Sequence, residues 1–113
     1  RDAVEFGPFL IVNGKSSFIT GNGGWGIAPR TAIGQRKDGI VLFLVIDGRT
    51  VSSIGADMLD LTKIMEQYGA YNAANLDGGS STELWIDGKI INHPVASGKD
   101  GLRNMPTFWI VKQ

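Results

Sequence analysis

Three short groups of polar residues have types and spacing that suit chemistry on an anionic substrate. The densest group is Asn75–Thr82, NLDGGSST, in which an acid and two glycines precede three hydroxyl residues. The glycines allow positive φ angles and let a ligand come close to main-chain N–H groups. The hydroxyls add donors for phosphate oxygens or sugar hydroxyls. A plain hairpin needs only the pair Asp77-Gly78, so this density of donors favours a binding site.

The other two groups each place a charged side chain at the start or the end of an apolar run. Arg30 and Thr31 follow a glycine-rich stretch and offer a planar guanidinium and a hydroxyl, which together suit an anionic group. Asp47, in Asp47-Gly48-Arg49, ends the most apolar run, where a carboxylate can face a cleft. Both groups also have ordinary interpretations, namely a strand-ending arginine paired with an acid and an Asp-Gly hairpin turn.

The remaining candidates carry weaker signals. Arg103, late in an irregular stretch, is placed to reach an anion, although a solvated charge is the simpler interpretation. His93 is the only histidine and there is no cysteine, which excludes thiol catalysis, cysteine-type zinc sites and two-histidine mechanisms. A further hypothesis places Ca²⁺ or Mg²⁺ between Asp47 and Asp77, because these cations prefer oxygen donors.

Mostly short strands must position these groups. Apolar runs bounded by turn residues predict strands at 8–12, 16–19, 31–35, 40–46, 71–76, 82–86, 89–92 and 107–112. The continuous apolar character of 40–46 favours a strand that is buried on both faces.

One helix is expected, over about 57–68. Its apolar residues share one face: Met58, Leu61, Ile64, Met65 and Tyr68. Asp57 suits the N-cap, and Gly69 stands where a C-terminal glycine belongs. The predicted fold class is therefore α+β, a strand-rich mixed sheet with one main helix packed on it.

The composition limits both the number of domains and the class of partner. At 113 residues the chain forms one domain, and 42% hydrophobic residues can fill its core. Eleven basic and eleven acidic side chains cancel, so no overall field attracts nucleic acid or an anionic membrane. No apolar run approaches the roughly 18 residues that a membrane span needs. The chain opens on Arg1 without a signal peptide, which indicates a processed or excised fragment.

The order and spacing of four elements resemble the phosphodiester glycosidase family, whose bacterial members are often described as exopolysaccharide-related. The elements are Arg30 with Thr31, Asp47-Gly48-Arg49, Asn75–Thr82 and Arg103. The match runs from about residue 7 to residue 111. Ser80 replaces a third glycine of the family pattern, and Glu83 and Leu84 stand where threonine and methionine are usual.

The resemblance implies a hydrolase that cleaves a glycosyl-1-phosphodiester bond in a glycan or envelope polymer, with a carbohydrate or sugar-phosphate partner and no required cofactor. A departing phosphodiester is already a good leaving group, so charge stabilisation around it matters most. Arg30 would supply that charge, and Asp47 or Asp77 would stand at the anomeric carbon as nucleophile or base. The implied substrate-binding residues are Thr31, Arg49, Gly78, Gly79, Ser80, Ser81 and Arg103.

The resemblance also bears on the extent of the domain. The family has a further N-terminal portion before the strand that matches Gly7-Pro8, so residues 1–113 are expected to form the C-terminal part of a single longer domain. Some site residues would then lie on a missing or separate segment. An extracellular or cell-envelope location is implied in the same way. The alternative function is a non-catalytic carbohydrate- or phosphate-binding module of the same fold.

Overall fold

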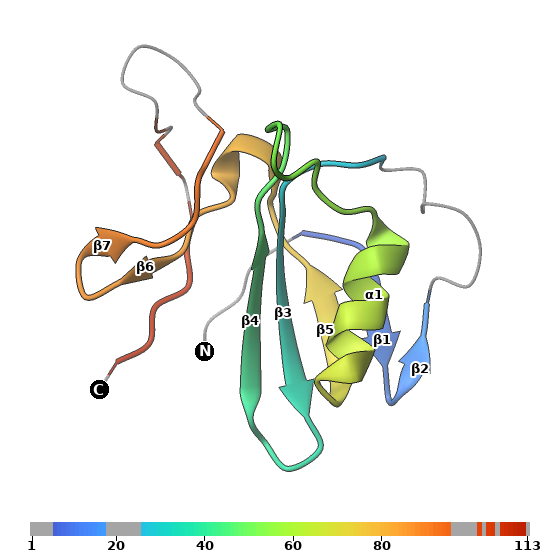
Figure 1. The fold of residues 1–113 in the computed structure, drawn as a ribbon. Helices are drawn as coiled ribbons and strands as arrows, with labels where there is room; N and C mark the ends of the chain where they lie inside the picture. The colour runs from blue at the N-terminus through green and yellow to red at the C-terminus, as the bar shows by residue number, and fades with distance from the viewer. Residues whose placement is uncertain (1–5, 18–25, 96–101, 103, 106, 113) are drawn as a thin grey trace.

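The computed structural model describes residues 6–17, 26–95, 102, 104–105 and 107–112 (Figure 1). Its elements are β1 (Phe9–Val12), β2 (Lys15–Ser16), β3 (Arg30–Arg36), β4 (Val41–Ile46), α1 (Met58–Gln67), β5 (Ala70–Asn75), the 3₁₀ turn η1 (Gly79–Ser81), β6 (Trp85–Ile86) and β7 (Lys89–Ile90). No helix in this part of the chain has the length and apolar character that crossing a membrane requires.

Five of the strands form one sheet in the order β2-β1-β5-β3-β4, and β6 pairs with β7 in a separate hairpin. The α+β class is confirmed. Every pairing between described strands is antiparallel, so the sheet is not the mixed one that the sequence predicted. The two strands joined by α1, β4 and β5, do run in the same direction, but they do not pair with each other because β3 lies between them.

The core lies between α1 and one face of this sheet. Met58, Leu61 and Met65 of the helix are at most 1% exposed and pack with apolar residues of β1, β3 and β5. A capping box fixes the start of the helix: Asp60 N–H donates to Asp57 Oδ1 at 2.8 Å, and Asp57 N–H donates to Asp60 Oδ2 at 3.1 Å. The predicted helix and its N-cap are thus confirmed.

Tyr68 does not belong to the buried face of the helix. It is the C-cap residue, and it is 65% exposed. The helix ends at this point, so the Tyr68 side chain no longer follows the buried face. Gly69 follows with a φ of +81°.

β4 is an edge strand and is not buried on both faces, which corrects the interpretation of its apolar run. Leu42, Leu44 and Ile46 pack against the core, whereas Val41 and Phe43 are about half exposed on the other face. Since α1 covers only one face of the sheet, the residues that alternate with the core-facing ones have no layer over them within the described part of the chain.

The last predicted strand, 107–112, does not form, although its residues include a continuous apolar run. Residues 107–112 have no regular structure and are exposed; Phe108 and Val111 are the most open. A strand needs a neighbour for its backbone groups, and this segment pairs with no described residue. Of the predicted strand 16–19, Lys15–Ser16 is present as β2, and residues 18–19 lie outside the described residues.

Candidate active site

The three polar groups singled out in the sequence meet at one edge of the sheet. β4 and β5 run in the same direction, so Asp47 and Asp77, which follow them, reach the edge where β3 starts with Arg30 (Figure 1). The turn η1 and the chain between β4 and α1 lie at this edge too. The fold therefore brings Arg30, Asp47 and Asp77 to the same edge of the sheet.

Close backbone packing around Pro29 holds the edge together. Gly79 N–H donates to the Pro29 carbonyl at 2.8 Å. A Cβ on Gly78 would stand 2.8 Å from that same carbonyl oxygen, and a Cβ on Gly48 would stand 2.8 Å from the Pro29 nitrogen. Only residues without a side chain allow approaches this close. The Asp-Gly pairs at 47–48 and 77–78 therefore serve to pack two carboxylate-bearing segments against one strand start.

Arg30 is buried beneath this edge, with 6% exposed surface. Its Nε donates to the Ala56 carbonyl at 3.0 Å, and one Nη donates to the Gly26 carbonyl at 2.7 Å. Burial lowers the pKa of the Arg30 guanidinium, and the positive charge of Arg49 lowers it further, whereas Asp57 raises it. The two guanidinium groups therefore repel each other, and a bound anion would relieve that repulsion.

Arg49 lies next to the glycine turn. A Cβ on Gly79 would stand 3.6 Å from one Nη of Arg49, so the guanidinium lies beside the turn in ordinary contact distance. Gly79 itself has a φ of +60°, which opens η1, and Thr82 N–H then bonds back to the Gly79 carbonyl at 3.2 Å. The exposed Arg49 side chain is thus available to a ligand at the turn.

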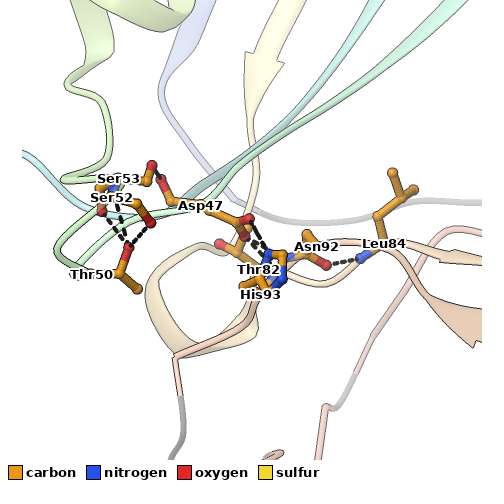
Figure 2. A network of polar contacts seen from close by, with 8 residues as sticks. All are labelled: Asp47, Thr50, Ser52, Ser53, Thr82, Leu84, Asn92 and His93. Atoms are coloured by element: carbon orange, nitrogen blue, oxygen red, sulfur yellow. Dashed lines mark hydrogen bonds and ion pairs between the residues drawn. The ribbon is translucent and has the colours of Figure 1, made fainter.

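Asp47 is held in place by hydrogen bonds (Figure 2). Oδ1 accepts from Asn92 Nδ2 at 3.0 Å, and both carboxylate oxygens accept from the His93 main-chain N–H at 3.0 and 3.1 Å. His93 Nδ1 lies 3.4 Å from Oδ2, and the Asp47 carbonyl accepts from Ser53 Oγ at 2.7 Å. These contacts fix the orientation of the carboxylate.

Not every predicted residue faces the same region. Thr31 pairs with Val45 and alternates with the buried residues Arg30 and Ala32, so its side chain belongs to the opposite sheet face. Its buried Oγ1 has no hydrogen-bond partner within the described residues. Ser80 and Ser81 are in η1, half-buried and buried. Arg103 lies outside the described residues.

Sequence reasoning missed Asn92 and Ser53, which both bond to Asp47. Neither position carries a local signal, because Asn92 follows a short apolar strand and Ser53 sits in a loop. Packing of the β6–β7 hairpin against the end of β4 brings Asn92 to the Asp47 carboxylate. Ser53, in the loop that follows β4, bonds to the Asp47 main-chain carbonyl instead.

The Arg30 hydrogen bonds give a first testable prediction. Arg30→Met should lower the free energy of unfolding by about 2–3 kcal/mol, because two main-chain carbonyls lose a charged donor in a buried place. Urea unfolding measures this loss. The matched control is Arg36→Met, which removes an exposed ion pair with Asp38 and should cost no more than about 1 kcal/mol. Equal losses in the two variants would contradict the role given to Arg30.

Comparisons with known proteins identify the class. The chain matches the model of the phosphodiester glycosidase family over residues 1–112. It is 42% identical over 96 residues to the SPbeta prophage-derived uncharacterized protein YomE of Bacillus subtilis, which covers 82% of this chain and 15% of that protein. The chain therefore belongs to the phosphodiester glycosidase family, as its motifs predicted.

Solved structures agree with this assignment. A hypothetical protein from Synechocystis is similar with a TM-score of 0.65 and 31% identity, over 78% of this chain and 17% of that one. The auto-inhibited catalytic domain of zebrafish N-acetylglucosamine-1-phosphodiester alpha-N-acetylglucosaminidase is similar with a TM-score of 0.56 and 32% identity, over 60% and 22%. The chain thus spans between 15% and 22% of the length of these three relatives.

Proposed function

We propose that this chain carries the catalytic edge of a hydrolase that cleaves glycosyl-1-phosphodiesters at the anomeric carbon. One observation carries the proposal. In the glycine turn after Asp77, Gly78 lies next to the buried Arg30 and Gly79 next to the guanidinium of the exposed Arg49. The two arginines would supply positive charge for a phosphate beside the Asp77 carboxylate. Membership of the phosphodiester glycosidase family supports this chemistry, and the zebrafish relative is named for N-acetylglucosamine-1-phosphodiesters.

The bond that breaks is the one between the anomeric carbon and the phosphate oxygen. Its electron pair leaves with the phosphate, and an oxygen from water ends on the anomeric carbon. Arg49 would bind the departing phosphate directly, and Arg30 would add positive charge from beneath the edge. The Ser80 hydroxyl in η1 would add a donor to this phosphate site, whereas the Gly79 and Ser81 N–H groups already bond to main-chain carbonyls. In an oxocarbenium-like transition state, Asp77 acts on the carbon as nucleophile or as base for water.

The test uses the methyl phosphodiester of α-N-acetylglucosamine 1-phosphate as substrate. The protein should release N-acetylglucosamine, measured as reducing sugar, together with methyl phosphate. Arg49→Ala should weaken binding of the diester, whereas Lys89→Ala, which removes an exposed charge from the β6–β7 hairpin, should leave binding unchanged. Binding of the diester in calorimetry without any release of sugar would overturn hydrolysis and favour the non-catalytic binding module.

A divalent cation between Asp47 and Asp77 is a separate hypothesis. In the part of the chain that the structure describes, no three His, Asp or Glu side chains cluster as a metal site would require. Asp47 instead accepts hydrogen bonds from N–H groups. We therefore expect a chelator such as EDTA to leave both the melting temperature and the turnover unchanged. A decrease in either quantity that Ca²⁺ or Mg²⁺ reverses would support the cation site instead.

The proposed substrate sets the expected location. Glycosyl-1-phosphodiesters of envelope polymers or secreted glycans would be met outside the cytoplasm, so an extracellular or cell-envelope location forms part of this proposal. Fractionation of the source cells, with the protein detected by antibody, tests it; recovery in the cytoplasmic fraction alone would contradict it.

A further inference from the structure

One amide side chain outside the predicted site joins two segments of it. Asn92 Nδ2 donates to Asp47 Oδ1 at 3.0 Å and to the Thr82 carbonyl at 2.8 Å, while its Oδ1 accepts from Leu84 N–H at 2.8 Å. Figure 2 shows the side chain between the end of β4 and the chain that leaves η1. Asn92 thus uses both ends of its amide, with one bond to the end of β4 and two to the chain that leaves η1.

These bonds hold the far end of the glycine turn. The turn begins at Gly79, whose N–H is fixed by the Pro29 carbonyl. It ends at Thr82, which is 1% exposed and whose carbonyl is fixed by Asn92. The orientation of the main-chain N–H groups and hydroxyls in between depends on both anchors. The Pro29 anchor belongs to the sheet, whereas the Asn92 anchor depends on Asp47.

We propose that Asp47 and Asn92 form a positioning pair that sets the geometry of the turn Gly79–Thr82 for catalysis. The proposal rests on the proposed function and gives Asp47 the role of a positioning residue, so that Asp77 alone acts at the anomeric carbon. Three observations support it. Both Asp47 oxygens already accept hydrogen bonds, its side chain is only 25% exposed, and its carboxylate contacts Asn92 and His93, which follow β7.

A carboxylate is well suited to this role. It accepts from the Asn92 amide and from the His93 main-chain N–H at once, and hydrogen bonds to a charged acceptor are stronger than neutral ones. The pair orients the amide so that its second N–H points at Thr82. Catalytic rate is sensitive to such placement, since a misplacement of about 1 Å can lower it about 10²-fold.

The first experiment compares Asn92→Ala with His93→Ala. The His93 side chain is 89% exposed, and its replacement leaves the main-chain N–H bonded to Asp47. Asn92→Ala should speed hydrogen exchange of the Thr82 and Leu84 amides at least ~10-fold, because the anchor of the turn and the acceptor of Leu84 are lost. Amides in the β3–β5 ladder should exchange as before. His93→Ala should change neither set. Unchanged exchange at Thr82 and Leu84 in Asn92→Ala would overturn the proposal.

The kinetic readout separates positioning from a purely structural role. Asn92→Ala should lower kcat about 10²-fold, with little change in KM, at a temperature where the variant is fully folded. A lower melting temperature with unchanged kcat would mean that the pair only stabilises the fold. If the unmodified protein releases no sugar, the proposed function fails, and the exchange data still decide whether the pair holds the turn.

A double substitution separates positioning from direct catalysis by Asp47. Asp47→Ala and Asn92→Ala should each lower kcat, because each breaks the hydrogen bond between the two side chains. Since Asp47 acts through Asn92, the two losses should not add, and the double variant should have a kcat within about tenfold of that of Asn92→Ala. A double variant in which the two losses multiply would show that the Asp47 carboxylate acts on the substrate.

Discussion

Replacing Asp77 with asparagine is expected to lower kcat for hydrolysis of the glycosyl-1-phosphodiester by about 10²–10⁴-fold. The amide has nearly the same shape but lacks the negative charge, so it can neither attack the anomeric carbon nor take a proton from water. Asp77 follows β5 and is half-buried beside Gly78, which packs against Pro29. The measurement is steady-state release of reducing sugar, with circular dichroism to verify that the variant is folded.

The control for Asp77→Asn is Asp87→Asn. Asp87 lies in the β6–β7 turn, is exposed and has a φ of +51°, which asparagine also tolerates. It undergoes the same chemical change at a place remote from the sheet edge, so its kcat should match that of the unmodified protein. Activity retained in Asp77→Asn would exclude Asp77 as nucleophile or base.

Replacing Gly55 with alanine is expected to cost about 4 kcal/mol of folding free energy. Gly55 has a φ of +111°, and a Cβ there would collide with the backbone of Ala28, including its carbonyl oxygen. Ala28 and Ala56 also form a two-hydrogen-bond bridge at this point, with N–H to carbonyl distances of 3.2 and 2.9 Å. The collision cannot be relieved by a side-chain rotation, because the backbone fixes the position of a Cβ and the Ala28 atoms that it meets are main chain. Urea unfolding measures the loss.

Gly39→Ala is the matched control for Gly55→Ala. Gly39 has a similar φ of +94° in the turn between β3 and β4, but a Cβ there would meet nothing within 4 Å. It should cost about 1–2 kcal/mol from backbone strain alone. The difference between the two losses of unfolding free energy measures the close contact between residues 54–56 and the chain just before β3. Losses of equal size would mean that this close approach does not stabilise the site edge.

The helix and the turns were predictable because their signals are local. Asp57 and Asp60 form a capping box three residues apart, and Met58, Leu61 and Met65 recur at helical spacing. The same holds for the Asn13-Gly14 turn that joins β1 to β2. In each case the deciding interaction lies within a few residues in the chain.

The strand environment was less predictable because it depends on distant partners. The apolar run of β4 has the composition of a central strand, yet β4 is at an edge because the fold order places β3 and β5 on one side only. The apolar run within residues 107–112 is typical of a strand, yet no described segment pairs with it. The composition of a segment shows that it favours apolar surroundings, but it does not show which neighbouring strand or helix will cover it.

The candidate site residues could be singled out in the sequence, but their arrangement depends on partners that are distant in the chain. The topology brings Arg30, Asp47 and Asp77 to one edge, because residues that follow two codirectional strands lie where the intervening strand starts. Thr31 was predicted to act with Arg30, but adjacent strand residues point to opposite faces. The Asn92 side chain, which helps to fix Asp47, is 45 residues away in the chain, so no local sequence pattern predicts the contact.

The most direct test of the central claim follows the oxygen that water contributes. The protein hydrolyses the methyl phosphodiester of α-N-acetylglucosamine 1-phosphate in heavy-oxygen water, and mass spectrometry locates the label at early times, before the sugar exchanges its anomeric oxygen. Cleavage at the anomeric carbon predicts the label in N-acetylglucosamine and none in methyl phosphate. Label in the phosphate product would mean attack at phosphorus and would contradict the assignment of this site as a glycosidase.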